Sequence, residues 1–66
     1  MEITVNGESK ILAQDATVSQ LLERLSMQPQ YVAVERNLDL VPRAEHASCV
    51  LQPGDRVEIV TLVGGG

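Results

Sequence analysis

The chain opens with short segments in which hydrophobic and polar residues alternate. Over Glu2 to Val5 every second residue is aliphatic, and over Ser9 to Ala13 the pattern resumes with Ile11 between polar and mixed neighbours. Between them, Asn6 and Gly7 form a dipeptide that favours a tight turn. These segments predict a β-hairpin.

The register of this hairpin depends on the length of its loop. A two-residue loop would place charged residues opposite core positions. A three-residue loop, Asn6-Gly7-Glu8, instead sets Ile3 opposite Ile11 and Met1 opposite Ala13. We therefore expect the three-residue loop.

A helical pattern follows the hairpin. Thr17 and Gln20 have the spacing of a capping box. Hydrophobic residues then recur at helical spacing, at Val18, Leu21, Leu22 and Leu25. Because Pro29 cannot continue a helix, we expect one helix from about Val18 to Met27 with one face packed on a sheet.

The second half of the chain predicts further extended segments. Tyr31 to Arg36 alternates as a strand does, Leu38 to Val41 is a short extended piece, and Pro42 to Ser48 is typical of a turn or a single helical turn. The turn signal Pro53-Gly54-Asp55 precedes the last strand, Arg56 to Val63. This strand has hydrophobic residues on both faces, with Val57, Ile59 and Thr61 on one and Glu58, Val60 and Leu62 on the other. Such a strand belongs in the middle of a sheet.

The order of these elements indicates the α+β class. We expect a β-grasp fold like that of ubiquitin, in which one helix crosses a mixed sheet of four or five strands and the last strand lies beside the first. Residues 1–63 would form this domain, and residues 64–66 would form a flexible C-terminal glycine tail.

Composition narrows the range of partners. The net charge is −4 and the only aromatic residue is Tyr31, which argues against nucleic acid. Cys49 and His46 are single residues of their kinds, so we expect neither a disulfide nor a metal site. The sequence shows no export signal and no apolar run that could cross a membrane, and we expect a cytoplasmic protein without a membrane partner.

Few residues suggest catalysis. Cys49 and His46 lie three residues apart and could pair as a nucleophile and a base, but no residue that would orient them can be assigned. We expect instead a half-buried thiol and a solvated histidine. The acidic residues at polar-face positions are likewise expected to be solvated. They are Glu2, Glu8, Glu23, Glu35 and Glu58.

The glycine terminus is more informative. Gly64 to Gly66 in extended form span roughly 10 Å, and without side chains they could enter a narrow channel. A frayed end or an expression scar would have the same sequence. If Glu58 faces water, so do Val60 and Leu62, with Ala33 beside them. This predicts an exposed apolar patch at the root of the tail, either a docking surface or a face covered by a second layer or a second copy.

Several short segments, in their order and spacing, resemble a known family. They are Ile3 to Gly7, Thr17-Val18 with Leu21-Leu22, Val32 to Asn37, Val41-Pro42-Arg43, Gly54 to Val60 and the glycine terminus. In these segments the whole chain resembles the small sulfur carrier proteins of thiamin biosynthesis, which are ubiquitin-like β-grasp proteins. Gly65-Gly66 match the family's terminal Gly-Gly, and Gly64 extends it.

The resemblance implies a function in sulfur transfer. An E1-like adenylyltransferase would use ATP and Mg²⁺ to adenylate the terminal carboxylate, and a cysteine-derived persulfide would then convert it to a thiocarboxylate, the sulfur donor for thiazole synthase. The chain itself would bind no cofactor and would not be an enzyme. Gly66 would bear the adenylate and the thiocarboxylate, and Gly64 and Gly65 would thread the partner's channel. The docking residues would be Val60, Leu62 and Val63.

Two kinds of alternative stay open. A carrier with the same terminus could serve another pathway, as the small subunit of molybdopterin synthase does, although such carriers are usually longer and richer in aromatic residues. A ubiquitin-like interaction module with an inert tail, or a modifier conjugated to lysines, would share the fold without carrying sulfur.

Overall fold

The computed structural model describes residues 1–62. In chain order its elements are β1 (Glu2–Val5), β2 (Glu8–Ile11), α1 (Val18–Arg24), η1 (Pro29–Tyr31), β3 (Val32–Arg36), β4 (Asp39–Val41), η2 (Arg43–Glu45) and β5 (Arg56–Thr61). The two η elements are single turns of 3₁₀-helix, and η2 lies in the segment predicted to be a turn. The predicted order of hairpin, helix and later strands is confirmed.

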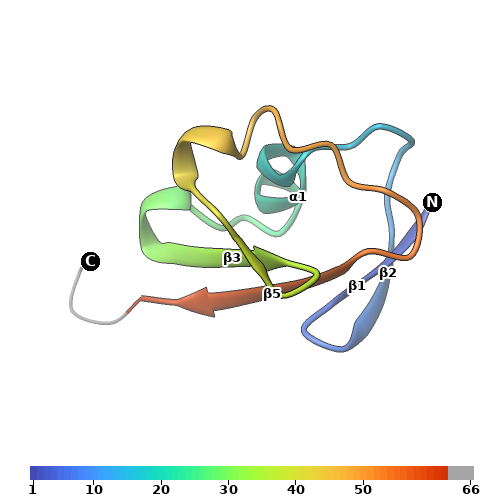
Figure 1. Cartoon of the computed structure of the whole chain (residues 1–66), viewed down its shortest axis with the longest axis horizontal. Helices are drawn as coiled ribbons and strands as arrows, with labels where there is room; N and C mark the ends of the chain where they lie inside the picture. Colours follow the sequence, from blue (N-terminus) through green and yellow to red (C-terminus); the bar gives the residue numbers. More distant parts are fainter. Residues whose placement is uncertain (63–66) are drawn as a thin grey trace.

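The five strands of the described residues form one mixed sheet in the order β2-β1-β5-β3-β4. Strand β5 pairs in parallel with β1 and antiparallel with β3, so the last strand lies in the middle of the sheet and beside the first. Helix α1 and η2 cover one side of the sheet (Figure 1). This is the predicted β-grasp arrangement.

The hairpin between β1 and β2 has a two-residue loop, not the three-residue loop that we expected. Val5 lies opposite Glu8, which leaves only Asn6 and Gly7 in the loop. Both loop residues have positive φ, 51° and 83°, as a type I′ turn requires. The twist of this turn matches that of paired strands, and Asn-Gly strongly favours it. This preference outweighs the cost of placing the charged Glu8 opposite Val5.

The shorter loop changes which residues of β2 face the core. Ile3 lies opposite Lys10, not opposite Ile11 as expected. Ile11 is therefore on the outer face, where 63% of its surface is exposed. Lys10 is half-buried, and because β2 is an edge strand its aliphatic stem can pack while its ammonium group stays in water.

Helix α1 begins with the predicted capping box. The backbone N–H of Gln20 donates to Oγ1 of Thr17 at 3.2 Å, and the backbone N–H of Thr17 donates to Oε1 of Gln20 at 2.9 Å. These bonds satisfy two of the free N–H groups at the helix start. Neither α1 nor any other helix within residues 1–62 is long and apolar enough to cross a membrane.

The same helix ends at Arg24, earlier than predicted. The N–H of Ser26 donates to the carbonyl of Glu23 at 3.0 Å, and the N–H of Met27 donates to the carbonyl of Leu22 at 2.9 Å. Ser26 has a φ of 58°. This is a Schellman motif, which stops the helix before the proline that we expected to end it. The predicted end at Met27 is therefore wrong.

Two later segments also start further along the chain than expected. Tyr31 belongs to η1, and β3 begins at Val32. Asn37 and Leu38 have φ values of 52° and 75° and form the turn before β4, which begins at Asp39. A left-handed conformation is unfavourable for leucine, and sequence alone gives no reason to place the turn there.

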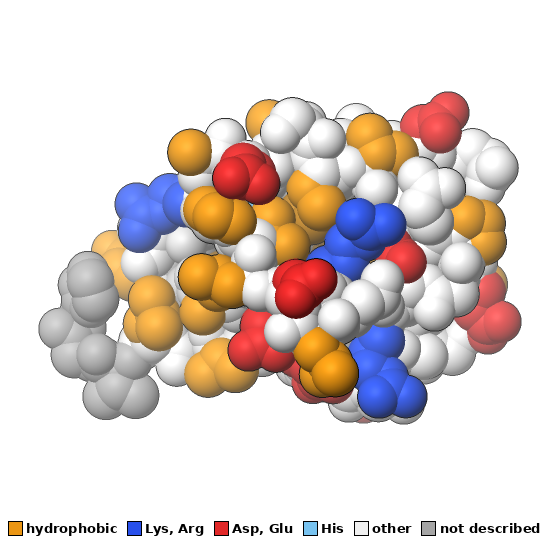
Figure 2. All heavy atoms as spheres, in the orientation of Figure 1, with side chains coloured by type: hydrophobic (Ala, Val, Ile, Leu, Met, Phe, Trp, Pro, Cys, Tyr) orange, Lys and Arg blue, Asp and Glu red, His pale blue; other side chains and the backbone are white. Residues whose placement is uncertain are grey.

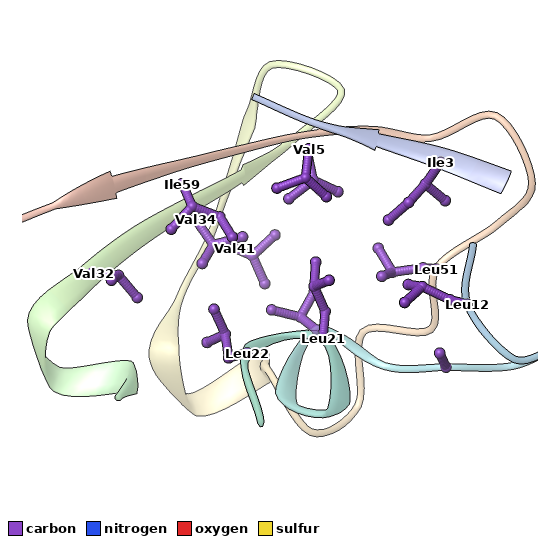
Figure 3. Packing of buried hydrophobic residues seen from close by; sticks show 13 residues of the cluster. Ile3, Val5, Leu12, Leu21, Leu22, Val32, Val34, Val41, Leu51 and Ile59 are labelled. Atoms are coloured by element: carbon purple, nitrogen blue, oxygen red, sulfur yellow. The ribbon is translucent and has the colours of Figure 1, made fainter. Parts of the chain in front are cut away.

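The core lies between the sheet and the helix (Figure 3). It is formed by the hydrophobic side chains that are buried among residues 1–62: Ile3, Val5, Leu12, Ala16, Val18, Leu21, Leu22, Val32, Val34, Val41, Leu51, Val57 and Ile59. They come from four strands, the helix and the long loops, so the core is one cluster on one side of the sheet.

Loop residues complete this core through backbone hydrogen bonds. The N–H of Leu12 donates to the carbonyl of Met1 at 2.8 Å, which continues the β1–β2 pairing and overturns the expected pairing of Met1 with Ala13. The N–H of Leu51 donates to the carbonyl of Ala16 at 2.8 Å. These bonds hold Leu12 and Leu51 against the helix side of the sheet.

Candidate functional site

Strand β5 ends at Thr61, earlier than expected. Two predicted docking residues lie on the outer side of the sheet here, Val60 within β5 and Leu62 directly after it. Val57 and Ile59 are buried, whereas 60% of the surface of Val60 and 38% of that of Leu62 is exposed. Thr61 faces the core side but is exposed because it lies at the end of the strand. The predicted division of β5 into a core face and an open face is confirmed.

Neighbouring residues extend the open apolar surface. Ala33 on β3 is the cross-strand partner of Val60. The N–H of Leu62 donates to the carbonyl of Tyr31 at 2.8 Å, and 46% of the surface of Tyr31 is exposed. We call Tyr31, Ala33, Val60 and Leu62 the apolar patch. Figure 2 shows hydrophobic side chains gathered at the end of the molecule where β5 ends.

Four residues with predicted functions lie outside the described part of the chain. They are Val63, Gly64, Gly65 and Gly66. The docking role of Val63, the threading role of Gly64 and Gly65, the attachment role of Gly66 and the domain boundary after residue 63 therefore stay predictions.

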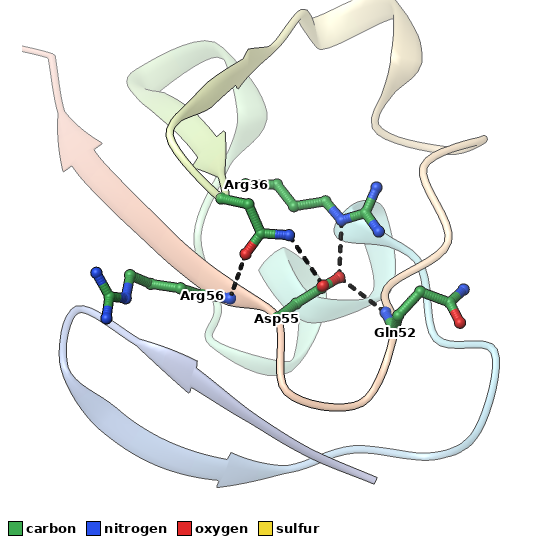
Figure 4. Close-up of polar contacts among 5 residues, drawn as sticks. Arg36, Gln52, Asp55 and Arg56 are labelled. Carbon is green, nitrogen blue, oxygen red and sulfur yellow. Dashed lines mark hydrogen bonds and ion pairs between the residues drawn. The ribbon is translucent and has the colours of Figure 1, made fainter.

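A buried carboxylate fixes the start of β5. Asp55 accepts hydrogen bonds from Nε of Arg36 at 2.7 Å, from Nδ2 of Asn37 at 3.0 Å and from the backbone N–H of Gln52 at 2.8 Å (Figure 4). The backbone N–H of Arg56 donates in turn to Oδ1 of Asn37 at 2.9 Å. These contacts join the turn that leads into β5 to the end of β3 and the residue after it.

The environment of Asp55 keeps it charged. Burial by itself would raise the pKa of this carboxyl group, but the hydrogen bonds from Gln52, Asn37 and Arg36 outweigh burial and hold the pKa below its ordinary value of 3.8. The same hydrogen bond to Asp55 is the main reason that the pKa of Arg36 is raised. Because its oxygens are already occupied, Asp55 stabilises the structure and is not available for chemistry.

Sequence reasoning missed this role. It assigned Asp55 only to a turn and Arg36 only to the end of a strand. The available signal was that both residues lie in segments that carry the family resemblance, Val32 to Asn37 and Gly54 to Val60.

Asn6 fixes β5 from its other side. Its Nδ2 donates to the carbonyl of Ile59 at 3.2 Å, and its Oδ1 accepts from the N–H of Ile59 at 2.8 Å. The backbone N–H of Asn6 donates to the carbonyl of Val57 at 2.9 Å. The side-chain amide of Asn6 thus continues the β1–β5 pairing where the backbone of β1 has turned away. Sequence reasoning had placed Asn6 only in the turn.

His46 is buried, contrary to the expectation that it is solvated. Only 3% of its surface is exposed, and its Nε2 lies 3.2 Å from the carbonyl oxygen of Val41. Its own carbonyl accepts from the N–H of Ser19 at 3.0 Å, so η2 is held against α1 and the ring is covered. Cys49 is half-buried as expected. Among residues 1–62, no three His, Cys, Asp or Glu side chains group closely enough to hold a metal ion.

The fold and this site define a class of protein. A β-grasp sheet holds its last strand at the centre, fixes that strand from both sides and leaves an apolar surface open at its end, as in a ubiquitin-like protein. More particularly, the chain belongs to the ThiS family, whose family model matches residues 1–66.

Named relatives are similar over the whole chain. The sulfur carrier protein ThiS of Escherichia coli (strain K12) is 32% identical over 66 residues, which are 100% of both chains. A crystal structure of a thiamine biosynthesis protein (ThiS) from Geobacter metallireducens is 35% identical, covers 100% of both chains and superposes with a TM-score of 0.86.

A second group of relatives is much longer. A thiazole synthase of Paramagnetospirillum magneticum is 41% identical over all 66 residues of this chain, which span 20% of that protein. A thiazole synthase of Magnetococcus marinus has the same identity and the same coverage. The chain thus spans about a fifth of the length of these relatives.

Proposed function

We propose that this chain is a sulfur carrier of thiamin biosynthesis whose C-terminal glycine, Gly66, carries sulfur as a thiocarboxylate. The observation that carries the proposal is the full-length similarity to ThiS proteins, together with a sequence that ends in glycines as that family requires. The chain supplies a structured body and a reactive end, and it is a co-substrate and not an enzyme. The carrier works in the cytoplasm, where ATP is available.

The chemistry follows from the low reactivity of a carboxylate. A carboxylate is a resonance-stabilised anion and a poor electrophile, so it first needs a leaving group. In the activating enzyme, which is E1-like and binds ATP and Mg²⁺, a terminal oxygen attacks the α-phosphorus and pyrophosphate leaves. The terminal sulfur of a cysteine-derived persulfide then attacks the acyl carbon, and AMP leaves. The product is an acyl disulfide that keeps the sulfur–sulfur bond of the persulfide. A second thiol attacks the donor's sulfur in that bond, so that a disulfide forms on the donor and the thiocarboxylate leaves.

The body of the protein presents this terminus. β5 is held on both sides and leads toward it, while the apolar patch offers a surface on which a partner can dock. Val60, Leu62 and Val63 would form the docking contacts. Gly64 and Gly65, which lack a Cβ atom, would pass through a narrow channel to the partner's active site.

The acceptor of the sulfur is thiazole synthase. The support for this partner is that two relatives of this chain are themselves named thiazole synthase and contain a region similar to all of its residues. A region of the same chain would act on its partner at a high effective concentration. A carrier on a different chain from its acceptor would instead have to find that acceptor by docking.

Intact-mass spectrometry tests the proposal. The purified protein is incubated with a cognate activating enzyme, ATP, Mg²⁺ and cysteine with a sulfurtransferase. We expect the mass to change by the exchange of one oxygen for one sulfur, and the change to map to Gly66 in the C-terminal peptide.

Two variants sharpen this test. Deletion of Gly66 should abolish the exchange, because the terminal carboxylate then falls short of the reacting atoms. Glu23→Gln, on the exposed face of α1, should leave it unchanged. If the wild-type protein shows no exchange with an enzyme that is active on another carrier, the proposal is wrong.

A further inference from the structure

Two carboxylates lie side by side on the open face of the sheet. Glu35 on β3 is the cross-strand partner of Glu58 on β5. The side chains of both point away from the core, because Val34 and Val57, their neighbours in sequence on the same strands, are buried. Glu35 is exposed and Glu58 is half-buried.

This pairing is unfavourable in the isolated protein. Like charges directly opposite each other on neighbouring strands are destabilising. Within residues 1–62, no lysine or arginine forms an ion pair with either carboxylate. The ion pairs of that region involve Glu8 and Asp55 instead. The two negative charges therefore face solvent without a partner from the described chain.

Hydrophobic side chains flank the pair on two sides, whereas Arg56, two residues before Glu58 on the same face of β5, is exposed. Ala33 and Val60, the next cross-strand pair on this face, belong to the apolar patch. Leu40 on β4 is the partner of Glu35 on its other side, and 65% of its surface is exposed. Figure 2 shows acidic side chains in the lower part of the view, with hydrophobic side chains and a Lys or Arg side chain beside them. A charged pair with apolar side chains on two sides is an arrangement suited to binding a cationic side chain of another protein.

We propose that Glu35 and Glu58 together bind a lysine or arginine side chain of the activating enzyme, with Leu40, Ala33 and Val60 packed around it. The inference rests on the proposed function and names the partner that binds this face. An enzyme that binds ATP must place positive charge around the nucleotide phosphates. Glu58 of the acidic pair lies on the strand that leads to the terminus, so the enzyme surface around the entrance to that site would contact the pair.

The charge of the whole chain supports the same partner. A protein of net charge −4 whose terminal carboxylate must approach ATP would be repelled by the nucleotide unless the enzyme surface attracts it. Bridging two carboxylates with one cation would remove their mutual repulsion on binding. The pair therefore costs stability in the free carrier and favours the complex.

Charge reversal separates binding from folding. In Glu35→Lys the like-charge pair becomes an opposite-charge pair with Glu58, so the melting temperature should be equal to that of the wild type or higher. For the activating enzyme, measured by carrier-dependent exchange of pyrophosphate into ATP, we expect KM for the carrier to rise roughly tenfold with a smaller change in kcat. The variant should lose less of its kcat/KM than the wild type when salt is raised.

Two further variants complete the design. Glu58→Lys should raise KM as Glu35→Lys does. Glu23→Lys on α1 makes the same change of charge on the opposite side of the molecule, and it should leave KM close to the wild-type value. A purely structural role of the pair would instead move the melting temperature and not KM.

The outcomes distinguish this inference from the proposed function. If the wild type is adenylated and both reversals keep the wild-type KM, the inference is wrong and the proposed function stands. The inference is equally wrong if the reversals weaken only the later transfer to thiazole synthase. If the wild type is not adenylated at all, both proposals fail.

Discussion

At the scale of single residues, a buried carboxylate with several hydrogen-bond partners contributes to the stability of this small protein. It is that of Asp55, which accepts bonds from Arg36, Asn37 and the backbone of Gln52. Hydrogen bonds to a buried charged group contribute more than neutral ones. Asp55, a residue of the turn before β5, therefore links β3 to β5.

Replacement of Asp55 by Asn should lower the free energy of unfolding by about 2 kcal/mol at neutral pH, because the charge that Arg36 faces is removed while Arg36 stays. Urea unfolding followed by circular dichroism measures the change. Asp39→Asn, at an exposed carboxylate on β4, is the matched control and should change stability by about 0.5 kcal/mol or less. Equal effects of the two substitutions would contradict the role given to Asp55.

The same variant predicts a dependence on pH. Since the pKa of Asp55 is lower in the folded protein than its ordinary value of 3.8, its contribution is fully present above that value and is lost as the pH falls through it toward the folded pKa. The difference in unfolding free energy between wild type and Asp55→Asn should therefore be constant from neutral pH down to about pH 5 and shrink below about pH 4. A difference that stayed the same in acid would show that the charge is not responsible.

At the scale of elements, the hairpin of β1 and β2 does more than pair two strands. Its first loop residue, Asn6, takes a left-handed conformation, which the type I′ turn needs, and its side chain bonds both backbone groups of Ile59. The turn is thus tied to the central strand. The first strand of the chain and the last one are joined at this point.

Substitutions of Asn6 can separate these two roles. Asn6→Gly keeps the left-handed conformation accessible but removes the bonds to Ile59, and it should cost about 1 to 2 kcal/mol of stability. Asn6→Ala removes the same bonds and also disfavours the conformation, and it should cost about 1 kcal/mol more. Thermal unfolding of both variants provides the comparison. If the glycine variant is as stable as the wild type, the side-chain bonds contribute nothing.

At the scale of the whole molecule, all of the described core lies on one side of the sheet and the other side is open. None of the helices and strands within residues 1–62 covers that open side. The apolar patch lies on it at the end of the central strand, and the acidic pair lies on it near the middle of that strand. The molecule therefore has its core on one side of the sheet and leaves the other side open for the proposed partner contacts.

A pair of matched substitutions tests whether the apolar patch is a docking surface. Val60 and Ile11 both lie on the open face and are 60% and 63% exposed, but Ile11 lies on the outer edge strand β2. Val60→Asp should leave the melting temperature nearly unchanged and weaken binding to the activating enzyme roughly tenfold, because a charge would be desolvated in the interface. Ile11→Asp should leave binding unchanged in the same titration. Unfolding of Val60→Asp would show that its side chain is not on an open face.

Several features were predictable because they depend on residues close together in the sequence. The capping box of Thr17 and Gln20 and the alternation in β5 were both confirmed. The hairpin loop was predicted one residue too long. The prediction was based on which residues would lie opposite Ile3, but the preference of Asn6 and Gly7 for a type I′ turn decides the register. The end of α1 was missed because a serine, Ser26, and not a glycine takes the left-handed position.

The candidate site was predicted in part. The open face of Val60 and Leu62 followed from strand periodicity, and the structure confirms it. The burial of His46 could not be foreseen, because the residues around it are polar and small. His46 is buried because η2 packs against α1. This contact joins residues far apart in the sequence, so no pattern of neighbouring residues predicts it.

By itself, the sequence determined the kinds of elements, their order and the faces of the central strand. These follow from periodicity, caps and turn residues, whose interactions reach only a few positions along the chain. Only the tertiary structure decided which distant groups meet: Asp55 and Arg36 are 19 positions apart, and Asn6 and Ile59 are 53 positions apart. It also brought Glu35 beside Glu58, because the register between two strands is set by how the whole sheet packs on its core.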